Sequence, residues 1–165
     1  MRIAIDFTSF IPQMTGVDTY MKQLVWNLAK VDRTNQYRIY HNHEDRRIFA
    51  DNLPGNFSHT SLSARPRLLR LISQQVMLPV AASGWKADVV HSPSFIMPYL
   101  RGVARHVLTV HDMTSFSHPH CHIALRRSWL YRRMVLASLR RADAVVVPSR
   151  ATRQAILEFL PDLQP

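Results

Sequence analysis

Three short apolar runs in the second half of the chain each end in small, polar or ionisable residues. The runs are ADVVHSP (87–93), HVLTVHD (106–112) and ADAVVVPS (142–149). Near-continuous valine and leucine is typical of strands that are buried on both faces, as in a parallel sheet. In an open parallel sheet the carboxyl ends of the strands lie along one edge, where ligands bind. The pattern therefore predicts an α/β sheet with polar side chains gathered at its carboxyl edge.

The remaining segments complete an alternation of strands and helices. Further strands are predicted at residues 2–6, 37–42 and, with a weaker pattern, 57–63. Helices are predicted from Asp18, taken as an N-cap, over 67–79 with an end near Pro79, over 124–141, and from residue 150. This order predicts a Rossmann-like, three-layer α/β domain with a mostly parallel sheet and helices on both faces.

Composition is that of a cytoplasmic globular protein. The 165 residues suffice for one domain, and 47% hydrophobic with 19% charged residues is ordinary for a folded chain. Cys121 is the single cysteine, which excludes an internal disulfide framework and fits a reducing compartment. No apolar run approaches the ~20 residues of a membrane span. The start MRIAIDFTSF is charged too early for a signal peptide, so a cytoplasmic location is predicted.

The net charge of +10 indicates an anionic partner: nucleic acid, a phosphorylated substrate or an anionic membrane leaflet. The sequence has no helix-turn-helix, zinc-finger or aromatic-glycine motif, so specific nucleic-acid binding is not expected. It also has no G-x-G-x-x-G after the first strand and no P-loop, which argues against a stand-alone nucleotide-dependent Rossmann enzyme. A non-catalytic basic module for nucleic acid or anionic membrane is the alternative to an enzyme.

Four stretches of the chain occur together, in this order, in a known family. They are RIAIDFTSF with TGVDTYMKQLVWNLAK, ADVVHSPSFIMP, LTVHDMTSFSHP and SLRRADAVVVPSRATRQAIL. The chain resembles the N-terminal half of retaining glycosyltransferases of the GT-B fold, specifically glycosyltransferase family 4. The first stretch resembles the family's first strand, glycine-bearing loop and first helix, and the third resembles its strand with His-Asp. The resemblance covers nearly the whole chain.

The resemblance implies two Rossmann-like domains, with the acceptor bound mainly by the N-terminal one and the nucleotide-sugar donor mainly by the C-terminal one. Residues 1–160 would form the acceptor-side domain and residues 161–165 the start of a linker, with the donor domain absent from this sequence. A sugar would pass to a glycan or lipid-linked acceptor in the cleft between the domains. The resemblance implies retention of anomeric configuration, no cofactor and no essential metal. The chain alone is therefore predicted to be inactive.

His111 and Asp112 are the predicted catalytic residues. By resemblance His111 would lie near the reacting sugar, and a neutral imidazole can hydrogen-bond a sugar hydroxyl. The alternative is a strand-end pair in which Asp112 caps the next turn. Thr15 and Gly16 are predicted to lie near the donor diphosphate, at the N-terminus of the first helix. The alternative for Gly16 is a tight turn before that helix.

Four further residues are acceptor-side candidates because they follow predicted strands: His91, Ser92, Ser149 and Arg150. The alternative for His91 and Ser92 is that they begin the turn that Pro93 imposes. Ser149 is expected to N-cap the last helix, with a contact to substrate as its alternative role.

Two other groups of residues each have a functional and a structural interpretation. The cluster His118, His120, Cys121 and His122 suggests a metal, but adjacent ligands converge poorly and no second cysteine completes a zinc pattern, so no metal is predicted. Arg126, Arg133 and Arg140 are seven apart and share one stripe of a helix. That stripe, with Trp129 and Tyr131 nearby, is either a solvated helix face or a surface that docks on the anionic inner face of the membrane.

Overall fold

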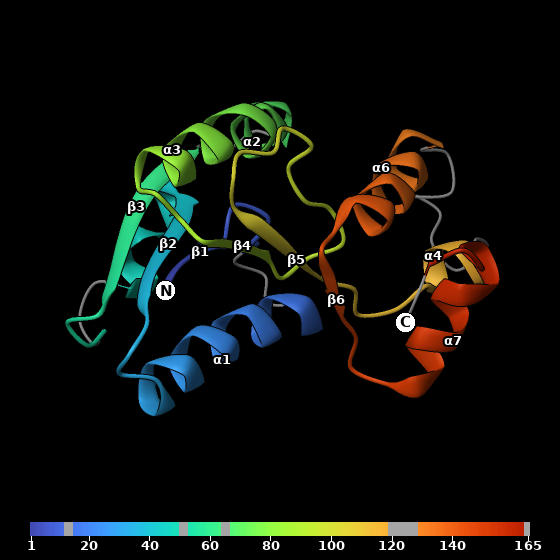
Figure 1. The fold of residues 1–165 in the computed structure, drawn as a ribbon, viewed down its shortest axis with the longest axis horizontal. Coiled ribbons are helices and arrows are strands. Elements are labelled where there is room, and N and C mark those ends of the chain that lie inside the picture. The colour runs from blue at the N-terminus through green and yellow to red at the C-terminus, as the bar shows by residue number, and fades with distance from the viewer. Residues whose placement is uncertain (12–14, 50–52, 64–66, 119–128, 164–165) are drawn as a thin grey trace.

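One sheet of six parallel strands organises the molecule, in the order β3-β2-β1-β4-β5-β6 (Figure 1). The strands are β1 (Arg2–Asp6), β2 (Gln36–Asn42), β3 (Phe57–Ser63), β4 (Val89–Ser92), β5 (Arg105–Thr109) and β6 (Ala144–Val146). The structure is a computed structural model that describes residues 1–11, 15–49, 53–63, 67–118 and 129–163. All neighbouring strands pair in parallel, which confirms the predicted sheet.

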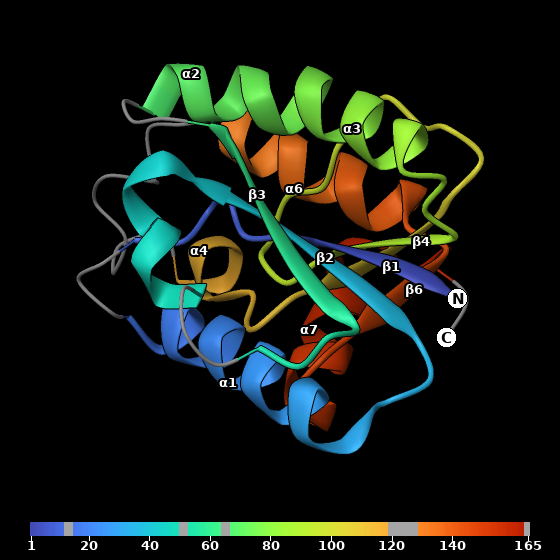
Figure 2. The same cartoon turned by 90° about the vertical axis from the view of Figure 1, so that its left-hand side faces the viewer.

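Helices cover both faces of the sheet and produce three layers (Figures 1 and 2). On one side lie α2 (Arg67–Ile72), α3 (Leu78–Gly84) and α6 (Trp129–Arg141), and on the other lie α1 (Gly16–Val31) and α7 (Arg150–Phe159). Two short helical elements, η1 (His43–Phe49) and α4 (Thr114–Ser117), follow β2 and β5. This arrangement is the Rossmann-like three-layer domain that the sequence predicts.

Each face of the sheet has its own hydrophobic core, because successive residues of a strand point to opposite sides. Ala4 of β1 belongs to a buried cluster with Leu78 of α3. Its neighbour Ile5 belongs to a second cluster with Met21 and Val25 of α1. A third cluster surrounds β5 and joins α6 to α7. Burial of the central strands β1, β4 and β5 explains why they appear in the sequence as apolar runs, whereas the edge strand β6 is partly exposed.

The start of α1 differs from the prediction that Asp18 is the N-cap. Thr15 is the N-cap, and Asp18 is the N3 residue that completes the capping box. The Asp18 carboxylate accepts hydrogen bonds from the N–H and the hydroxyl of Thr15, at 2.9 and 2.7 Å, and from the N–H of Ile11 at 2.9 Å. Asp18 is only 2% exposed. The Asp18 carboxylate therefore fixes the segment that precedes α1 through hydrogen bonds within the protein.

The second predicted helix does not end near Pro79. It continues through a π-helical turn, η2 (Ser73–Met77), into α3, which ends at Gly84. In this turn Leu78 donates its N–H to the carbonyl of Ser73, five residues earlier. The backbone hydrogen bonds before Pro79 therefore already follow the wider π-helical pattern. Pro79 itself lies in the first turn of α3, where the N–H that proline lacks would have no partner within the helix. One helical rod, residues 67–84, results.

Candidate active site at the carboxyl edge of the sheet

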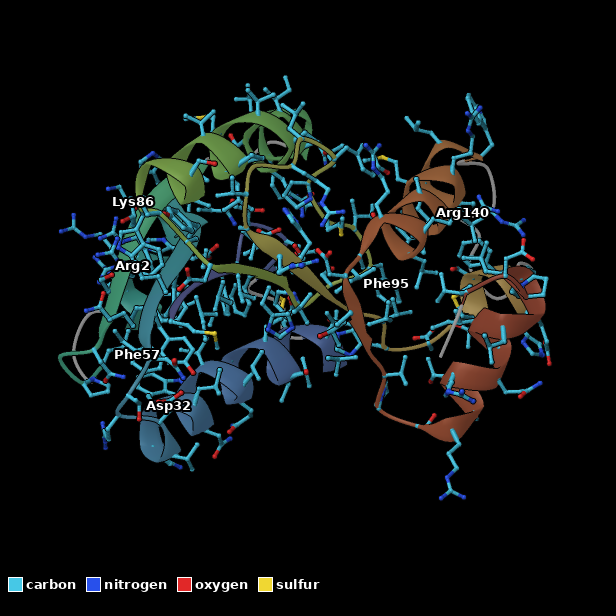
Figure 3. All side chains as sticks on the ribbon, in the orientation of Figure 1. Arg2, Asp32, Phe57, Lys86, Phe95 and Arg140 are labelled. Atoms are coloured by element: carbon cyan, nitrogen blue, oxygen red, sulfur yellow. The ribbon has the colours of Figure 1, made fainter. Side chains whose placement is uncertain are left out.

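The carboxyl ends of β1 and β4 form the point at which the order of the strands reverses. From β1 the chain moves outward to β2 and β3, and it then returns to β4 on the other side of β1. In open α/β sheets such a reversal creates a crevice at the carboxyl edge, where ligands bind. The residues predicted from the sequence all lie at the ends of strands or after them along this edge: Thr15, Gly16, His91, Ser92, His111, Asp112, Ser149 and Arg150. Figure 3 shows Phe95, of the loop after β4, on the β5 side of the molecule, away from Arg2, Asp32 and Lys86.

His111 is fixed by contacts from three separate segments. Its Nε2 lies 3.0 Å from the carbonyl oxygen of Pro93, in the loop after β4. Its ring meets those of Tyr20 of α1 and Phe95 edge-on, with centroids 4.7 and 5.7 Å apart. Its own carbonyl accepts a hydrogen bond from Oγ1 of Thr152 in α7 at 3.1 Å. These contacts hold the imidazole in one orientation at the end of β5.

The bond to Pro93 determines which ring nitrogen of His111 remains available. A carbonyl oxygen only accepts, so Nε2 must carry the proton that it donates. In the neutral ring Nδ1 is then an acceptor, which can take a hydrogen bond from a hydroxyl group. The ring is half-buried, so it is both oriented by the protein and open to a ligand.

His91 and Thr109 extend a polar row along the α1 side of the sheet toward His111. Nε2 of His91 lies 2.9 Å from Oγ1 of Thr109. His91 is in register with Ile5 of β1, whose side chain faces α1. Burial lowers the pKa of His91 to about 4, so the ring is neutral near pH 7. His91 and Thr109 therefore offer neutral hydrogen-bonding groups next to the crevice.

Ser92 faces the opposite side of the sheet. Side chains alternate along a strand, and Val90, two residues earlier, belongs to the cluster beneath α3. Oγ of Ser92 is buried and has no hydrogen-bond partner among the described residues. The structure therefore brings together His91 and His111 but does not add Ser92 to their row.

Asp112 holds the turn that follows β5. Its Oδ1 accepts hydrogen bonds from the N–H of Thr114 at 2.9 Å and from the hydroxyl of Thr114 at 2.6 Å. These bonds fix the first turn of α4. Asp112 therefore caps the turn after β5, which is the alternative role predicted from the sequence. A catalytic role for Asp112 stays a prediction.

Ser149 is the N-cap of α7, as expected from the sequence. Its Oγ accepts the N–H of Thr152 at 3.1 Å and lies 3.0 Å from Oγ1 of the same residue. Because Thr152 also donates to the carbonyl of His111, the cap connects the start of α7 to the end of β5. Arg150, the first residue of α7, is exposed beside this cap.

Thr15 and Gly16 form the start of α1, where the first N–H groups have no partner within the helix. No glycine of the described ranges has a positive φ, so a left-handed turn is not what requires Gly16. Among the described residues, no heavy atom lies within 4 Å of a Cβ placed on Gly16. The fold thus leaves open space beside a helix N-terminus, which favours an anion.

Asp6 is a buried acid that the sequence analysis did not single out. It is 1% exposed at the end of β1. Its carboxylate accepts Nε2 of Gln74 at 2.6 Å, and the N–H and hydroxyl of Thr8 at 3.0 and 2.7 Å. Burial raises the pKa of Asp6. Its contacts attach β1 to η2 below the crevice, and its only signal in the sequence is an acid that closes the run RIAID.

Two further findings concern metal ligands and membrane spans in the part of the chain that the structure describes. There, no group of three or more histidine, cysteine, aspartate and glutamate side chains could hold a metal ion. Of the predicted histidine cluster, only His118 belongs to that part, and His120, Cys121 and His122 lie outside the described residues. Among helices of the same ranges, none combines the length and the hydropathy that crossing a bilayer requires.

A pocket of about 600 Å³ lies away from the strand ends, beside the edge strand β6. It opens between α6 and α7, and Leu139, Val145 and Ile156 are among the residues that line it. None of the candidate residues lines this pocket. The polar row at the reversal of the sheet, rather than this mainly apolar hollow, carries the chemistry of the candidate site.

Comparison with known proteins identifies the family of the chain. The family model for Glycosyltransferase Family 4 matches residues 14–162. The chain belongs to glycosyltransferase family 4. It is thus an N-terminal domain of the glycosyltransferase type, with the Rossmann-like fold that forms the N-terminal half of GT-B proteins.

One solved structure shows the same fold. UDP-GlcNAc 2-epimerase from Methanocaldococcus jannaschii superposes with a TM-score of 0.59 at 11% sequence identity. The match covers 96% of this family 4 chain and 42% of the epimerase, so the chain spans less than half the length of that protein. At this identity the likeness concerns the fold alone. No curated protein matches the chain.

Proposed function

We propose that the chain is the acceptor-side half of a retaining glycosyltransferase. The enzyme moves a sugar from a nucleotide-sugar to a glycan or lipid-linked acceptor in polysaccharide biosynthesis. The observation that carries the proposal is the orientation of His111 beside the reversal of the sheet, with Nε2 bonded to Pro93 and Nδ1 left as an acceptor. Membership of family 4 supports the class of reaction.

The donor diphosphate is proposed to lie at the start of α1, near Thr15 and Gly16. The unpaired N–H groups and the positive end of the helix dipole favour its negative charge. The space beside Gly16 lets a phosphate approach the backbone closely. Because N–H groups can meet the charge of the diphosphate, the proposal needs no metal or other cofactor.

In the proposed reaction His111 accepts a hydrogen bond from a hydroxyl of the donor sugar through Nδ1 and so orients the sugar. The bond between C1 of the sugar and the diphosphate oxygen breaks while the acceptor oxygen bonds to C1 on the same face. The proton of the acceptor hydroxyl ends on the departing diphosphate. His91 and Thr109 supply neutral hydrogen-bonding groups on the same side of the sheet as His111.

The domain arrangement is part of the proposal. Residues 1–160 form the acceptor-side domain, residues 161–165 begin a linker, and a donor half completes the cleft. The chain by itself then transfers no sugar. The reaction is proposed to run in the cytoplasm, at the inner face of the membrane, since a net charge of +10 favours an anionic surface.

The test is an assay of sugar transfer with a panel of labelled nucleotide-sugars. We compare the chain alone with a protein in which it is joined to a donor half, and we assign the anomeric configuration of the product by NMR. Turnover by the two-domain protein only, with the configuration of the donor retained, is the expected result. Transfer by the chain alone, or inversion at C1, would contradict the proposal.

A further inference from the structure

The helical rod of α2, η2 and α3 exposes an apolar stripe to its surroundings. Its members follow spacings of three and four: Leu69 (50% exposed), Ile72 (50%), Val76 (47%) and Val80 (68%), with Met77 (47%) beside them. Such spacing places them on one face of the rod. From Leu71 to Trp85 the sequence contains no charged residue. This outer face therefore lacks the charges that normally solvate a surface helix.

The inner face of the same rod is already filled. Gln74, Leu78 and Ala82 are buried against the sheet. A helix that is apolar on both sides is typically covered on both sides. A continuous exposed apolar patch, unlike single exposed residues, marks an interaction surface. The outer stripe is therefore expected to contact a partner, because the core of the domain covers only the inner face.

A basic surface lies beside this stripe, in the same helical layer. Tyr99 connects the two parts, because its N–H donates to Oε1 of Gln75 in η2 at 3.0 Å and its hydroxyl donates to the carbonyl of Met134 in α6 at 2.8 Å. Figure 1 shows α6 on the same side of the sheet as α2 and α3, and apart from them. The exposed residues of α6 include Arg133 and Arg140.

The start of α6 adds an aromatic side chain to this surface. Trp129 is 64% exposed, and the guanidinium of Arg133 lies 5.1 Å from the centre of its ring. Tryptophan prefers the boundary between lipid headgroups and hydrocarbon, and arginine binds the phosphates of those headgroups. An apolar stripe, a tryptophan and arginines in one layer match the depth profile of an anionic bilayer surface.

We infer that the outer face of α2–α3, together with α6, docks on an anionic lipid bilayer. The apolar stripe enters the headgroup boundary and the arginines of α6 meet the phosphates. A second copy of the chain fits less well, since a net charge of +10 opposes self-association. A donor half also fits less well, since it would meet the carboxyl edge, whereas the stripe is the exposed face of a rod whose other face is buried against the sheet. The inference deepens the proposed function, on which it rests for a lipid-linked acceptor.

The experiment is flotation of the chain with vesicles of phosphatidylcholine, alone or mixed with phosphatidylglycerol. The test variant is Val76→Glu with Val80→Glu. The control is Val31→Glu, because Val31 is 79% exposed on α1, on the other side of the sheet. We expect the unsubstituted chain and the control to bind the mixed vesicles, and the double variant to bind about tenfold or more weakly, since two apolar side chains no longer enter the lipid.

Absence of binding by the unsubstituted chain, or equal binding by the double variant and the control, would overturn the inference. So would self-association in light scattering that the double variant abolishes, because it would assign the stripe to a second copy. If the double variant does not fold, hydrogen exchange of the unsubstituted chain decides: vesicles must slow exchange in α2–α3 and not in α1. The vesicles contain neither donor nor acceptor, so this result and the sugar-transfer assay can fail independently.

Discussion

The two edges of the sheet use their ionisable side chains in opposite ways. At the amino edge, Asp88 accepts the N–H of Arg2 at 2.7 Å and Asp143 accepts the N–H of His106 at 2.7 Å, so each carboxylate fixes the first residues of a strand. At the carboxyl edge, His91 and His111 each contribute one ring nitrogen to a bond within the protein. The two carboxylates at the amino edge thus stabilise the starts of strands, whereas the two histidines at the carboxyl edge are held in fixed orientations at the candidate site.

The causes of the pKa shifts also differ between Asp143 at the amino edge and His91 at the carboxyl edge. The hydrogen bond from the N–H of His106, followed by those from Arg101 and Arg105, lowers the pKa of Asp143 to about 2 and favours the charged form. At His91 burial lowers the pKa to about 4 and favours the neutral form. Asp143 at the amino edge is thus charged and paired within the fold, whereas His91 at the carboxyl edge is uncharged at pH 7.

Replacing His111 by alanine has the largest expected effect and tests the carboxyl edge. In a two-domain enzyme we expect turnover to fall by about a hundredfold or more, the order of magnitude contributed by a positioned group at the reacting centre. Folding should stay intact, as judged by a thermal melt of the same protein. The control is His43→Ala, since His43 is exposed at the start of η1. An unchanged rate would make His111 a structural residue.

Replacing Asp143 by alanine tests the amino edge in the reverse direction. The variant loses the bond to the N–H of His106 and the ion pairs with Arg101 and Arg105. We expect the free energy of unfolding to fall by about 1 to 2 kcal/mol, since partly exposed ion pairs add little to the hydrogen bond. Turnover per folded molecule should not change. Urea unfolding measures the loss, with the exposed Asp162→Ala as the control. Equal stability of both variants would remove the distinction between the edges.

Replacing Gly16 by alanine separates ligand binding from folding at the carboxyl edge itself. The fold has room for the added methyl group, and alanine is the better helix former by roughly 0.5–1 kcal/mol, so the melting temperature should hold or rise slightly. The Michaelis constant for the donor should rise by about tenfold, which corresponds to about 1.4 kcal/mol, if the diphosphate occupies that room. Donor titrations with both proteins measure the change. Unaltered donor binding would place the diphosphate elsewhere.

The last expected effect is a difference in acid stability. Because the folded pKa of His91 is about 4 against an ordinary 6.5, the unfolded chain takes up its proton first as the pH falls. The contribution of His91 is full above pH 6.5 and is lost on the way down to about pH 4. The pKa of Asp143 is about 2 against an ordinary 3.8, so its contribution is lost only between those lower values. Acid should therefore remove the contribution of His91 before that of Asp143.

Thermal melts of His91→Gln against the unsubstituted chain check this order. The variant should lose less stability than the unsubstituted chain between pH 6.5 and 4, since glutamine does not titrate. Burial also lowers the pKa values of His41 and His106, so part of the slope persists in the variant. Parallel slopes for the two proteins would contradict the assignment to His91.

Much of the fold could be predicted because its causes are local. Strands buried on both faces need continuous apolar runs, and residues 37–42 and 57–63 have weaker strand patterns, so all six strands are visible in the sequence. The position of His111 at the end of β5 follows from the same pattern. Its partners could not be predicted, since Tyr20, Phe95 and Thr152 come from three distant segments that only the packed fold brings together.

The errors also have physical reasons. Asp18 has a good capping side chain, but the neighbouring Thr15 takes the cap and leaves Asp18 to close the capping box. Proline normally ends a helix, but the π-helical turn before Pro79 lets the rod continue. Local preference cannot reveal either outcome, since each depends on which of two neighbouring arrangements packs better.

The central place of β1 in the sheet has a consequence for how the protein is made. Arg2 begins the strand, and its bonded partner Asp88 follows 86 residues later in the chain. At a synthesis rate of about 5–20 residues per second, this partner leaves the ribosome roughly 4–17 s after Arg2. Until then β1 presents an unpaired, largely apolar edge, the kind of surface that invites aggregation. Nascent chains that stop before β4 are therefore expected to be the species most in need of a chaperone.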